Sequence, residues 1–315
     1  MKNIVYFLFL LSNNSFAQNI DVQSYFLDVS VSDETNKITV VEKIQIEFTK
    51  NCNELELDLS NQDERGMGMR VSKVQESGLD VEFKQINDKL IIQTKRGFES
   101  NVMSYLIEFD GIPKDGLIIG QNKYGARTFF GDNWPNRAHN WFACVDHPSD
   151  KATINYTITA PKHYQCVANG ELVKVDETDR FNKRFIFHSN ISIPTKVMVF
   201  GLADLKVTSS KQGDITMFNW VYPQDEKNGF KDMEVAKFPL EMFIEKIGPY
   251  PFEELENVQS TTRFGGMENA GCIFYDENAI TGNGTMENLI AHEIAHQWFG
   301  NSVTETDWNH LWLSE

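Results

Sequence analysis

Apolar and polar positions alternate with a period of two through the first two thirds of the chain. The clearest runs are Ile38–Phe48, Leu55–Leu59 and Thr153–Thr159, and clusters of Gly, Pro, Asn and Asp separate such runs between about residues 20 and 223. A period of two places apolar side chains on one face of a strand. We therefore predict an antiparallel all-β domain with one buried face.

The period lengthens towards that of a helix in the remaining third. Apolar residues in Lys231–Ile247 recur near helical spacing, and Gly248-Pro249 ends the pattern, which predicts one helix. We interpret Pro251–Gln259 as a connector and Thr261–Tyr275 as a strand-like stretch.

Two more helices are predicted at the end of the sequence. Thr285 can cap a helix that runs through His296, and Gly300 suits its C-terminal end. A second helix from about Thr306 carries three apolar residues and a carboxylate at helical spacing, namely Trp308, Leu311, Trp312 and Glu315.

The change of period sets a domain boundary near residues 205–225. We take 18–210 as an N-terminal all-β domain and 211–315 as a second domain that combines helices and strands, so the fold class is α+β and multidomain. The 315 residues are 41% hydrophobic and 12% aromatic, which is ample for a packed core. The net charge of −16 argues against nucleic acid and anionic membranes as partners.

Residues 1–17 have the features of a signal peptide. Lys2 supplies a short positive region, Ile4–Leu11 an apolar region, and Ser15-Phe16-Ala17 a cleavage site before Gln18. The apolar region is far shorter than the roughly 20 residues that span a bilayer, so we expect no stable membrane span. We expect an exported protein, periplasmic or secreted.

The cysteines are scattered and show no C-x-x-C spacing, which argues against a cysteine-ligated zinc site. In an exported protein some of them could pair, and free buried thiols are the alternative. They are Cys52, Cys144, Cys166 and Cys272.

The sequence His292-Glu293-Ile294-Ala295-His296 carries the most specific chemistry. Residues four apart share one face of a helix, so both imidazoles can reach one metal ion. Glu315, on the following helix, would complete a His₂Glu set that leaves a position open for water. An amphipathic helix with two ordinary histidines is the alternative, and the predicted cap and Glu315 argue against it. We predict one Zn²⁺ per chain.

The predicted site is suited to metal-assisted amide hydrolysis. Zinc brings the pKa of bound water to about 7, and Glu293 is placed to act as general base and to pass the proton to a leaving amine. We expect three apolar side chains to exclude water from the site: Trp298, Phe299 and Trp312. Three polar residues are candidates for orienting the histidines: Asn301, Glu305 and Asp307.

The segment Gly265-Gly266-Met267-Glu268-Asn269 is a second candidate for substrate binding. The glycines allow another backbone to approach closely, as an edge strand that binds substrate requires. Glu268 would then offer a carboxylate near the zinc. Taken alone, these residues are better explained by the default interpretation, a Gly-Gly turn followed by an exposed glutamate.

Together these motifs resemble the gluzincin aminopeptidases of the aminopeptidase N and leukotriene hydrolase type. The resemblance covers the mature chain. It also includes His292–Asn301, Leu311–Glu315, and two segments that look like a bacterial branch of the family, Phe130–Arg137 and Asp146–Pro148.

This resemblance implies a saddle-shaped N-terminal β domain followed by part of a thermolysin-like domain. It implies His292, His296 and Glu315 as zinc ligands and Glu293 as general base. It also implies that Glu268 holds the free α-amine of a peptide substrate, so that the enzyme is an aminopeptidase. Family members add a carboxylate or amide from the β domain, and Asp132 or Asn133 lies in the corresponding region.

The family continues beyond its third zinc ligand with a tyrosine that stabilises the oxyanion and with a helical domain. We therefore expect this sequence to be a fragment or truncated product, in which Glu315 at a chain end holds zinc poorly. Two alternatives stay open. One is a catalytically dead protein that binds peptide or zinc, and the other is an endopeptidase or a bifunctional epoxide hydrolase on the same scaffold.

Overall fold

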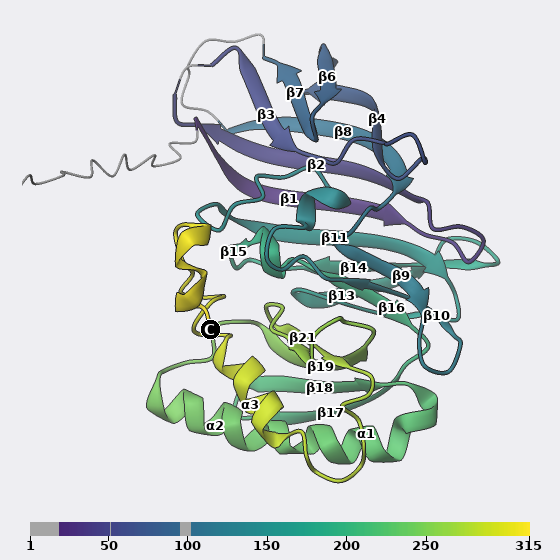
Figure 1. Ribbon diagram of the computed structural model, residues 1–315, viewed down its shortest axis with the longest axis vertical. Helices are drawn as coiled ribbons and strands as arrows, with labels where there is room; N and C mark the ends of the chain where they lie inside the picture. Colours follow the sequence, from purple (N-terminus) through teal and green to yellow (C-terminus); the bar gives the residue numbers. More distant parts are fainter. Residues whose placement is uncertain (1–18, 51, 95–101) are drawn as a thin grey trace, which may run out of the picture.

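A mixed sheet of nine strands forms most of the N-terminal part of this computed structural model, which describes residues 19–50, 52–94 and 102–315 (Figure 1). The predicted signal peptide lies outside the described residues. In pairing order the strands are β13 (Glu171–Glu177), β14 (Asn182–His188), β11 (Lys151–Pro161), β1 (Ile20–Ser30), β2 (Ile38–Phe48), β8 (Val102–Ile112), β4 (Gly68–Glu76) and β5 (Leu79–Asp80), with β15 (Ile193–Pro194) paired to β11.

The alternation read from the sequence appears in the burial of these strands. In β2, Thr39, Val41 and Lys43 lie on one face and are exposed. On the other face, Ile38, Val40 and every second residue up to Ile46 are buried. One ladder departs from the antiparallel expectation, because β1 and β11 run parallel. The connection between them passes through many intervening strands, and a long connection permits parallel pairing.

Two smaller sheets complete this part of the chain. Figure 1 places the first of them beside β2 and β8, and the second between the large sheet and the C-terminal part. The first contains β3 (Glu54–Asp58), β7 (Lys89–Gln93) and β6 (Phe83–Ile86), and the second contains β12 (Gln165–Ala168), β16 (Phe200–Ala203), β10 (Arg127–Gly131) and β9 (Leu117–Gln121).

The C-terminal part is a five-stranded sheet with helices packed against it. Its two inner ladders, β18–β19 and β19–β21, are parallel, and the two-residue strand β20 forms one edge. The elements are β17 (Lys206–Gln212), β18 (Ile215–Val221), α1 (Glu226–Met233), α2 (Lys237–Lys246), β19 (Glu254–Ser260), β20 (Gly266–Met267), β21 (Cys272–Asp276) and α3 (Glu287–Ala295).

Strand β19 corrects the interpretation of Pro251–Gln259 as a connector. Its polar side chains Glu256, Asn257 and Gln259 are buried, at 3% exposure or less. They are satisfied inside the protein, since Asn257 donates to Asn219 and Gln259 to Asp225. A central strand that buries paired polar groups carries no hydrophobic signal for sequence analysis to detect.

The predicted helix at Lys231–Ile247 is two helices, α1 and α2, joined by a 3₁₀ turn at Glu234–Ala236. The turn rotates the second helix, so that Phe238 points outward with 65% of its surface exposed. The helix that carries the metal motif begins at Glu287 with Met286 at its N-cap, and Thr285 does not cap it. Thr285 instead pairs with the hydroxyl of Thr281.

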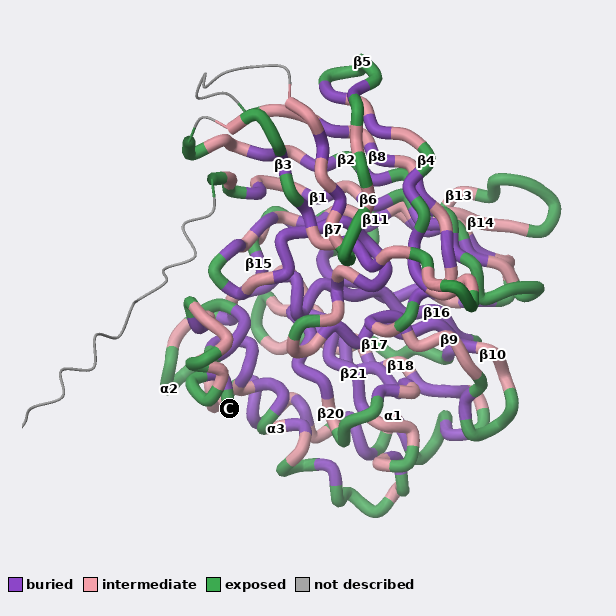
Figure 2. The backbone as a smooth tube through the Cα atoms, turned by 45° about the horizontal axis from the view of Figure 1, so that its top comes forward, coloured by how far each residue is buried: buried purple, intermediate pink, exposed green. Residues whose placement is uncertain are grey.

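The last predicted helix is a 3₁₀ helix, Trp308–Leu313, with Glu315 just beyond it. The larger of two apolar clusters extends from β1 to the segment after α3, from Val22 to Trp298, and a smaller one runs from Phe130 to Phe274. Figure 2 shows this buried backbone running through the centre of the molecule. Within the described ranges, no helix combines the length and apolarity needed to cross a bilayer.

Candidate metal centre

Helix α3 brings two histidines to a common point. His292 lies in its last turn, and His296 follows one turn later at its C-cap. Their Nε2 atoms are 3.1 Å apart. Two nitrogens bound to one zinc at 2.0–2.1 Å in tetrahedral geometry would be separated by about 3.3 Å. The spacing therefore fits two ligands of one zinc ion.

Glu315 supplies the third donor. One ligand atom from each of His292, His296 and Glu315 lies within 4.8 Å of the other two. Among the residues that the structure describes, this is the one group of His, Cys, Asp and Glu with such spacing. The four cysteines are free and take no part in it. Two imidazoles and a carboxylate are the donor set of a catalytic zinc site with an open position.

Backbone, and not a carboxylate, orients His296. Its Nδ1 lies 3.2 Å from the carbonyl oxygen of Phe299, which leaves Nε2 facing the cluster. Burial lowers the pKa of His296, so the neutral imidazole that a metal requires is favoured. The three orienting candidates were wrong. Asn301 donates to the carbonyl of Glu268, Glu305 pairs with Lys196, and Asp307 caps the 3₁₀ helix.

Glu293 points into the same region from α3 and is 4% exposed. Its pKa is raised to about 9, chiefly by burial and also by the negative charges of Glu268 and Glu315. A divalent cation at the cluster would oppose this shift, because it favours the ionised carboxylate. Glu293, the general base predicted from the sequence, therefore lies beside the metal cluster, and its surroundings favour the protonated carboxyl group.

The Gly-Gly-Met-Glu-Asn segment forms the opposite wall. The carbonyl of Glu268 accepts hydrogen bonds from Gln297 Nε2 at 3.1 Å and from Asn301 Nδ2 at 2.6 Å. Gln297 follows His296 directly and Asn301 lies five residues after it, so the segment after His296 also holds the backbone of Glu268. The carboxylate of Glu268 is 7% exposed, and its Oε1 has no hydrogen-bond partner. Burial raises its pKa to about 7.

The two glycines of this segment differ in their surroundings. A Cβ on Gly266 would lie 2.1 Å from Oε1 of Glu293, whereas a Cβ on Gly265 would meet only Leu289, at 3.8 Å. Gly266 therefore leaves room for the carboxylate of Glu293. Met267 pairs with Phe274 in the ladder β20–β21. Asn269 is fully buried and does not line the hollow.

A hollow of about 390 Å³ joins these groups. Its apolar walls come from Trp134, Phe264 and Leu289, with the rings of Trp134 and Phe264 edge to face at 5.7 Å. The aromatic residues predicted to exclude water do not line it. Trp298 is buried elsewhere, where it donates to Pro249, and Phe299 and Trp312 are more than half exposed. The remaining lining residues are Gly265, Gly266, Met267, Glu268, His292, Glu293, His296 and Glu315.

The β domain reaches the hollow through Trp134, and not through its two polar neighbours. Asp132 is buried against Arg137. Asn133 donates to the carbonyls of Thr195 and Met198 and accepts from Trp141. Neither residue lines the hollow. Trp134 was missed because an aromatic residue beside proline gives no sign of facing a metal.

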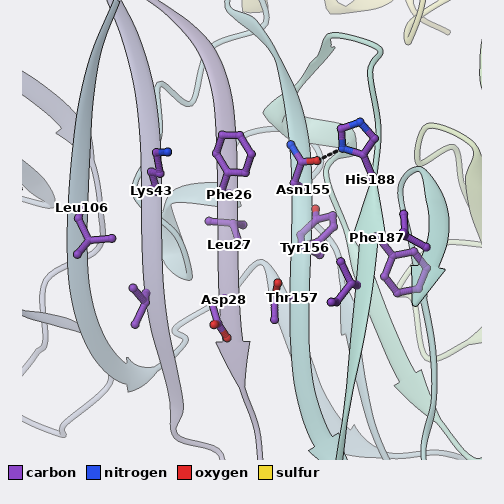
Figure 3. Close-up of a pocket in the computed structure, with 13 residues that line it drawn as sticks. Phe26, Leu27, Asp28, Lys43, Leu106, Asn155, Tyr156, Thr157, Phe187 and His188 are labelled. Carbon is purple, nitrogen blue, oxygen red and sulfur yellow. Dashed lines mark hydrogen bonds between the residues drawn. The ribbon is translucent and has the colours of Figure 1, made fainter. Parts of the chain in front are cut away.

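A second hollow lies away from the metal cluster, on the open face of the nine-stranded sheet. Figure 3 shows side chains from neighbouring strands around it, including Phe26 on β1, Asn155 and Tyr156 on β11, and His188 on β14. Asn155 and His188 are hydrogen-bonded to each other. No residue of the predicted site lies among those that line it.

Two domains of one peptidase family match the sequence. Residues 21–197 match the Peptidase M1 N-terminal domain, and residues 232–315 match the Peptidase family M1 domain. Among curated relatives, a probable aminopeptidase 2 of Sulfurisphaera tokodaii is 27% identical across 94% of this chain, and a glutamyl aminopeptidase of Rattus norvegicus is 26% identical across 92%. The chain spans only 38% and 33% of these two proteins.

Solved structures share the fold. An M1 zinc metallopeptidase from Deinococcus radiodurans superposes with a TM-score of 0.78 at 23% identity, covering 95% of this chain and 68% of that one. A mutant of the same enzyme, bound to a Tyr-Ser-Ala substrate, gives 0.76 at 24% identity, with the same coverage of each chain. The arrangement of sheets and helices is therefore one that these solved structures also have.

Proposed function

This chain belongs to peptidase family M1, and we propose on that premise that it carries the metal-binding part of a zinc aminopeptidase. Zinc is the cofactor that both the family and the His₂Glu donor set indicate. The observation that carries the proposal is the convergence of His292, His296 and Glu315, with ligand atoms within 4.8 Å, beside the buried carboxylate of Glu293.

The residues divide the work of hydrolysis between them. His292, His296 and Glu315 would hold the ion, which when bound polarises the scissile carbonyl and acidifies water. Glu293, which lines the same hollow, would accept a proton from the attacking water and deliver it to the leaving amine. Trp134, Phe264 and Leu289 keep the hollow apolar, so charges within it interact more strongly than in bulk water.

Glu268 makes the proposed enzyme an exopeptidase. Its Oε1 is buried without a partner and lies in the same hollow as Glu293. A substrate ammonium would supply both the hydrogen bond and the opposite charge that this carboxylate lacks. The negative charges of Glu268, Glu293 and Glu315 favour a cationic group there, whereas an acetylated amine would leave Glu268 unpaired. Peptides with a free N-terminal amine are therefore the proposed substrates.

The direct test is hydrolysis of unblocked aminoacyl amides with and without a chelator. We expect turnover that 1,10-phenanthroline abolishes and that added Zn²⁺ restores. A His292→Ala variant should be inactive under all three conditions. Turnover that survives complete removal of metal would refute the zinc mechanism.

We also propose export, on the strength of the positive, apolar and small-residue regions in 1–17. The expected mature protein begins at Gln18. N-terminal sequencing of protein recovered from outside the cytoplasm tests this, and an intact Met1 on the recovered protein would contradict it.

A further inference from the structure

A buried ionic network lies behind the metal cluster. Lys196 belongs to a 3₁₀ turn, Thr195–Val197, between strands β15 and β16 of the β domain. Its Nζ lies 2.6 Å from Oε1 of Glu305 and 3.2 Å from Oγ of Ser314. The hydroxyl of Ser314 donates in turn to the other oxygen of Glu305. Each of the three residues is at most 5% exposed.

This network ends on the residue next to a metal ligand. Ser314 precedes Glu315, and its Cβ lies 3.4 Å from the position that a Cβ on Gly300 would take. That same position is 3.6 Å from Nδ1 of His296. Lys196 and Glu305 thus fix the backbone from which Glu315 reaches the cluster, directly beside the second histidine.

We propose that Lys196 is a positioning residue for the metal centre, acting through Glu305 and Ser314 to place Glu315 opposite His292 and His296. This inference rests on the proposed function. It makes the β domain part of the metal site, because the lysine comes from that domain whereas the ligands do not.

Energetics favour a positioning role over a simple contribution to stability. Removing two charges from water is costly, and a buried ion pair often stabilises a fold no better than apolar residues of similar size. Here the ion pair restricts the orientation of Ser314. Its ammonium and its carboxylate are both hydrogen-bonded to the Ser314 hydroxyl, so that side chain can adopt few arrangements. Two apolar side chains would fill the space without fixing that hydroxyl.

A second lysine offers a matched control. Lys151, at the start of β11, pairs in register with Pro194, two residues before Lys196. Its Nζ donates to the carbonyls of Asn301 and Ser302, so it also joins the β domain to the segment after α3. It has no hydrogen bond to Ser314 or Glu305. Replacing it removes the hydrogen bonds to Asn301 and Ser302 and leaves the hydrogen bonds among Lys196, Glu305 and Ser314 in place.

The test measures zinc affinity of the full chain by competition with a chromophoric chelator, using Zn²⁺ alone as the ligand. Ser314→Ala and Lys196→Met should raise the zinc dissociation constant by about 10- to 100-fold, the usual effect of removing a group that orients a ligand. Lys151→Met should leave it unchanged. With Co²⁺ in place of zinc, the visible spectrum of Ser314→Ala should shift towards that of Glu315→Ala.

The double variant Lys196→Met/Glu305→Met separates positioning from stability, since it leaves no unpaired buried charge. We expect its thermal midpoint without metal to be near that of the original chain, and its zinc affinity to stay low. Unchanged zinc affinity in both this variant and Ser314→Ala would overturn the inference. If instead the original chain binds zinc and His292→Ala binds it equally well, the proposed metal centre itself is refuted.

Discussion

The carboxylate of Glu293 occupies the space that a side chain at position 266 would need: a Cβ on Gly266 would lie 2.1 Å from its Oε1. Strand β20 and helix α3 are therefore in contact at the point where catalysis is proposed. Neither Gly266 nor Gly265 has a left-handed backbone conformation, so alanine at either position creates no backbone strain.

Gly266→Ala should move the Glu293 carboxylate and lower kcat for aminoacyl amides by about 100-fold, since displacing a catalytic group by an ångström has effects of this size. Gly265→Ala is the matched control, because its new methyl group meets only Leu289 at 3.8 Å. Steady-state kinetics on the two variants makes the comparison. Equal activity of the two variants would show that the contact between position 266 and Glu293 does not affect catalysis.

Glu293→Gln keeps the shape of the side chain and removes its ability to accept a proton. We expect kcat to fall by at least ~100-fold, the contribution typical of a general base. Zinc binding should persist, because Glu293 is not one of the clustered donors. Chelator competition and kinetics on the same preparation measure both quantities. Near-normal turnover in a zinc-loaded variant would exclude Glu293 as the base.

Glu268→Gln should reduce kcat/KM for free-amine substrates by roughly 10- to 100-fold, which corresponds to the loss of a hydrogen bond to a charged group. Acetylated peptides make no ammonium contact, so their slow turnover should change little. The quantity to compare is the ratio of kcat/KM for unblocked and acetylated versions of one peptide. If the substitution leaves this ratio unchanged, Glu268 does not recognise the substrate amine.

The metal-free chain should lose stability as pH rises. The pKa of Glu268 is raised to about 7 and that of Glu293 to about 9, so the folded chain keeps these protons after the unfolded chain has released them near pH 4.5. Between about pH 5 and 9 the unfolded state binds fewer protons, and the free energy of unfolding falls with pH. Above pH 9 this contribution is constant.

Thermal unfolding of the chelated protein from pH 5 to 9 measures that slope. Glu293→Gln removes the group with the larger shift, so the variant should show a shallower decline and a higher midpoint than the original chain at pH 9. An identical pH profile for the two proteins would mean that Glu293 does not retain its proton in the folded state.

Sequence periodicity anticipated the elements whose burial follows a simple rule. The alternation in Ile38–Phe48 coincides with β2, because one face of that strand packs on the core and the other does not. The rule failed for β19, where Asn257 and Gln259 are buried but paired with polar partners. It also failed for Phe238, because the 3₁₀ turn before α2 changed which residues share a face.

What the sequence determined by itself was the local chemistry. A spacing of four on a helix is enough to bring His292 and His296 together, since helical geometry fixes the separation of their side chains. The tertiary structure alone decided the surroundings of that pair. Trp134, Gly266 and Lys196 come from distant segments. Only the packing of the β domain against the five-stranded sheet brings Trp134 and Gly266 to one hollow and places Lys196 behind the metal cluster. Contacts between distant segments depend on how whole faces fit together, and no local pattern of residues records that fit.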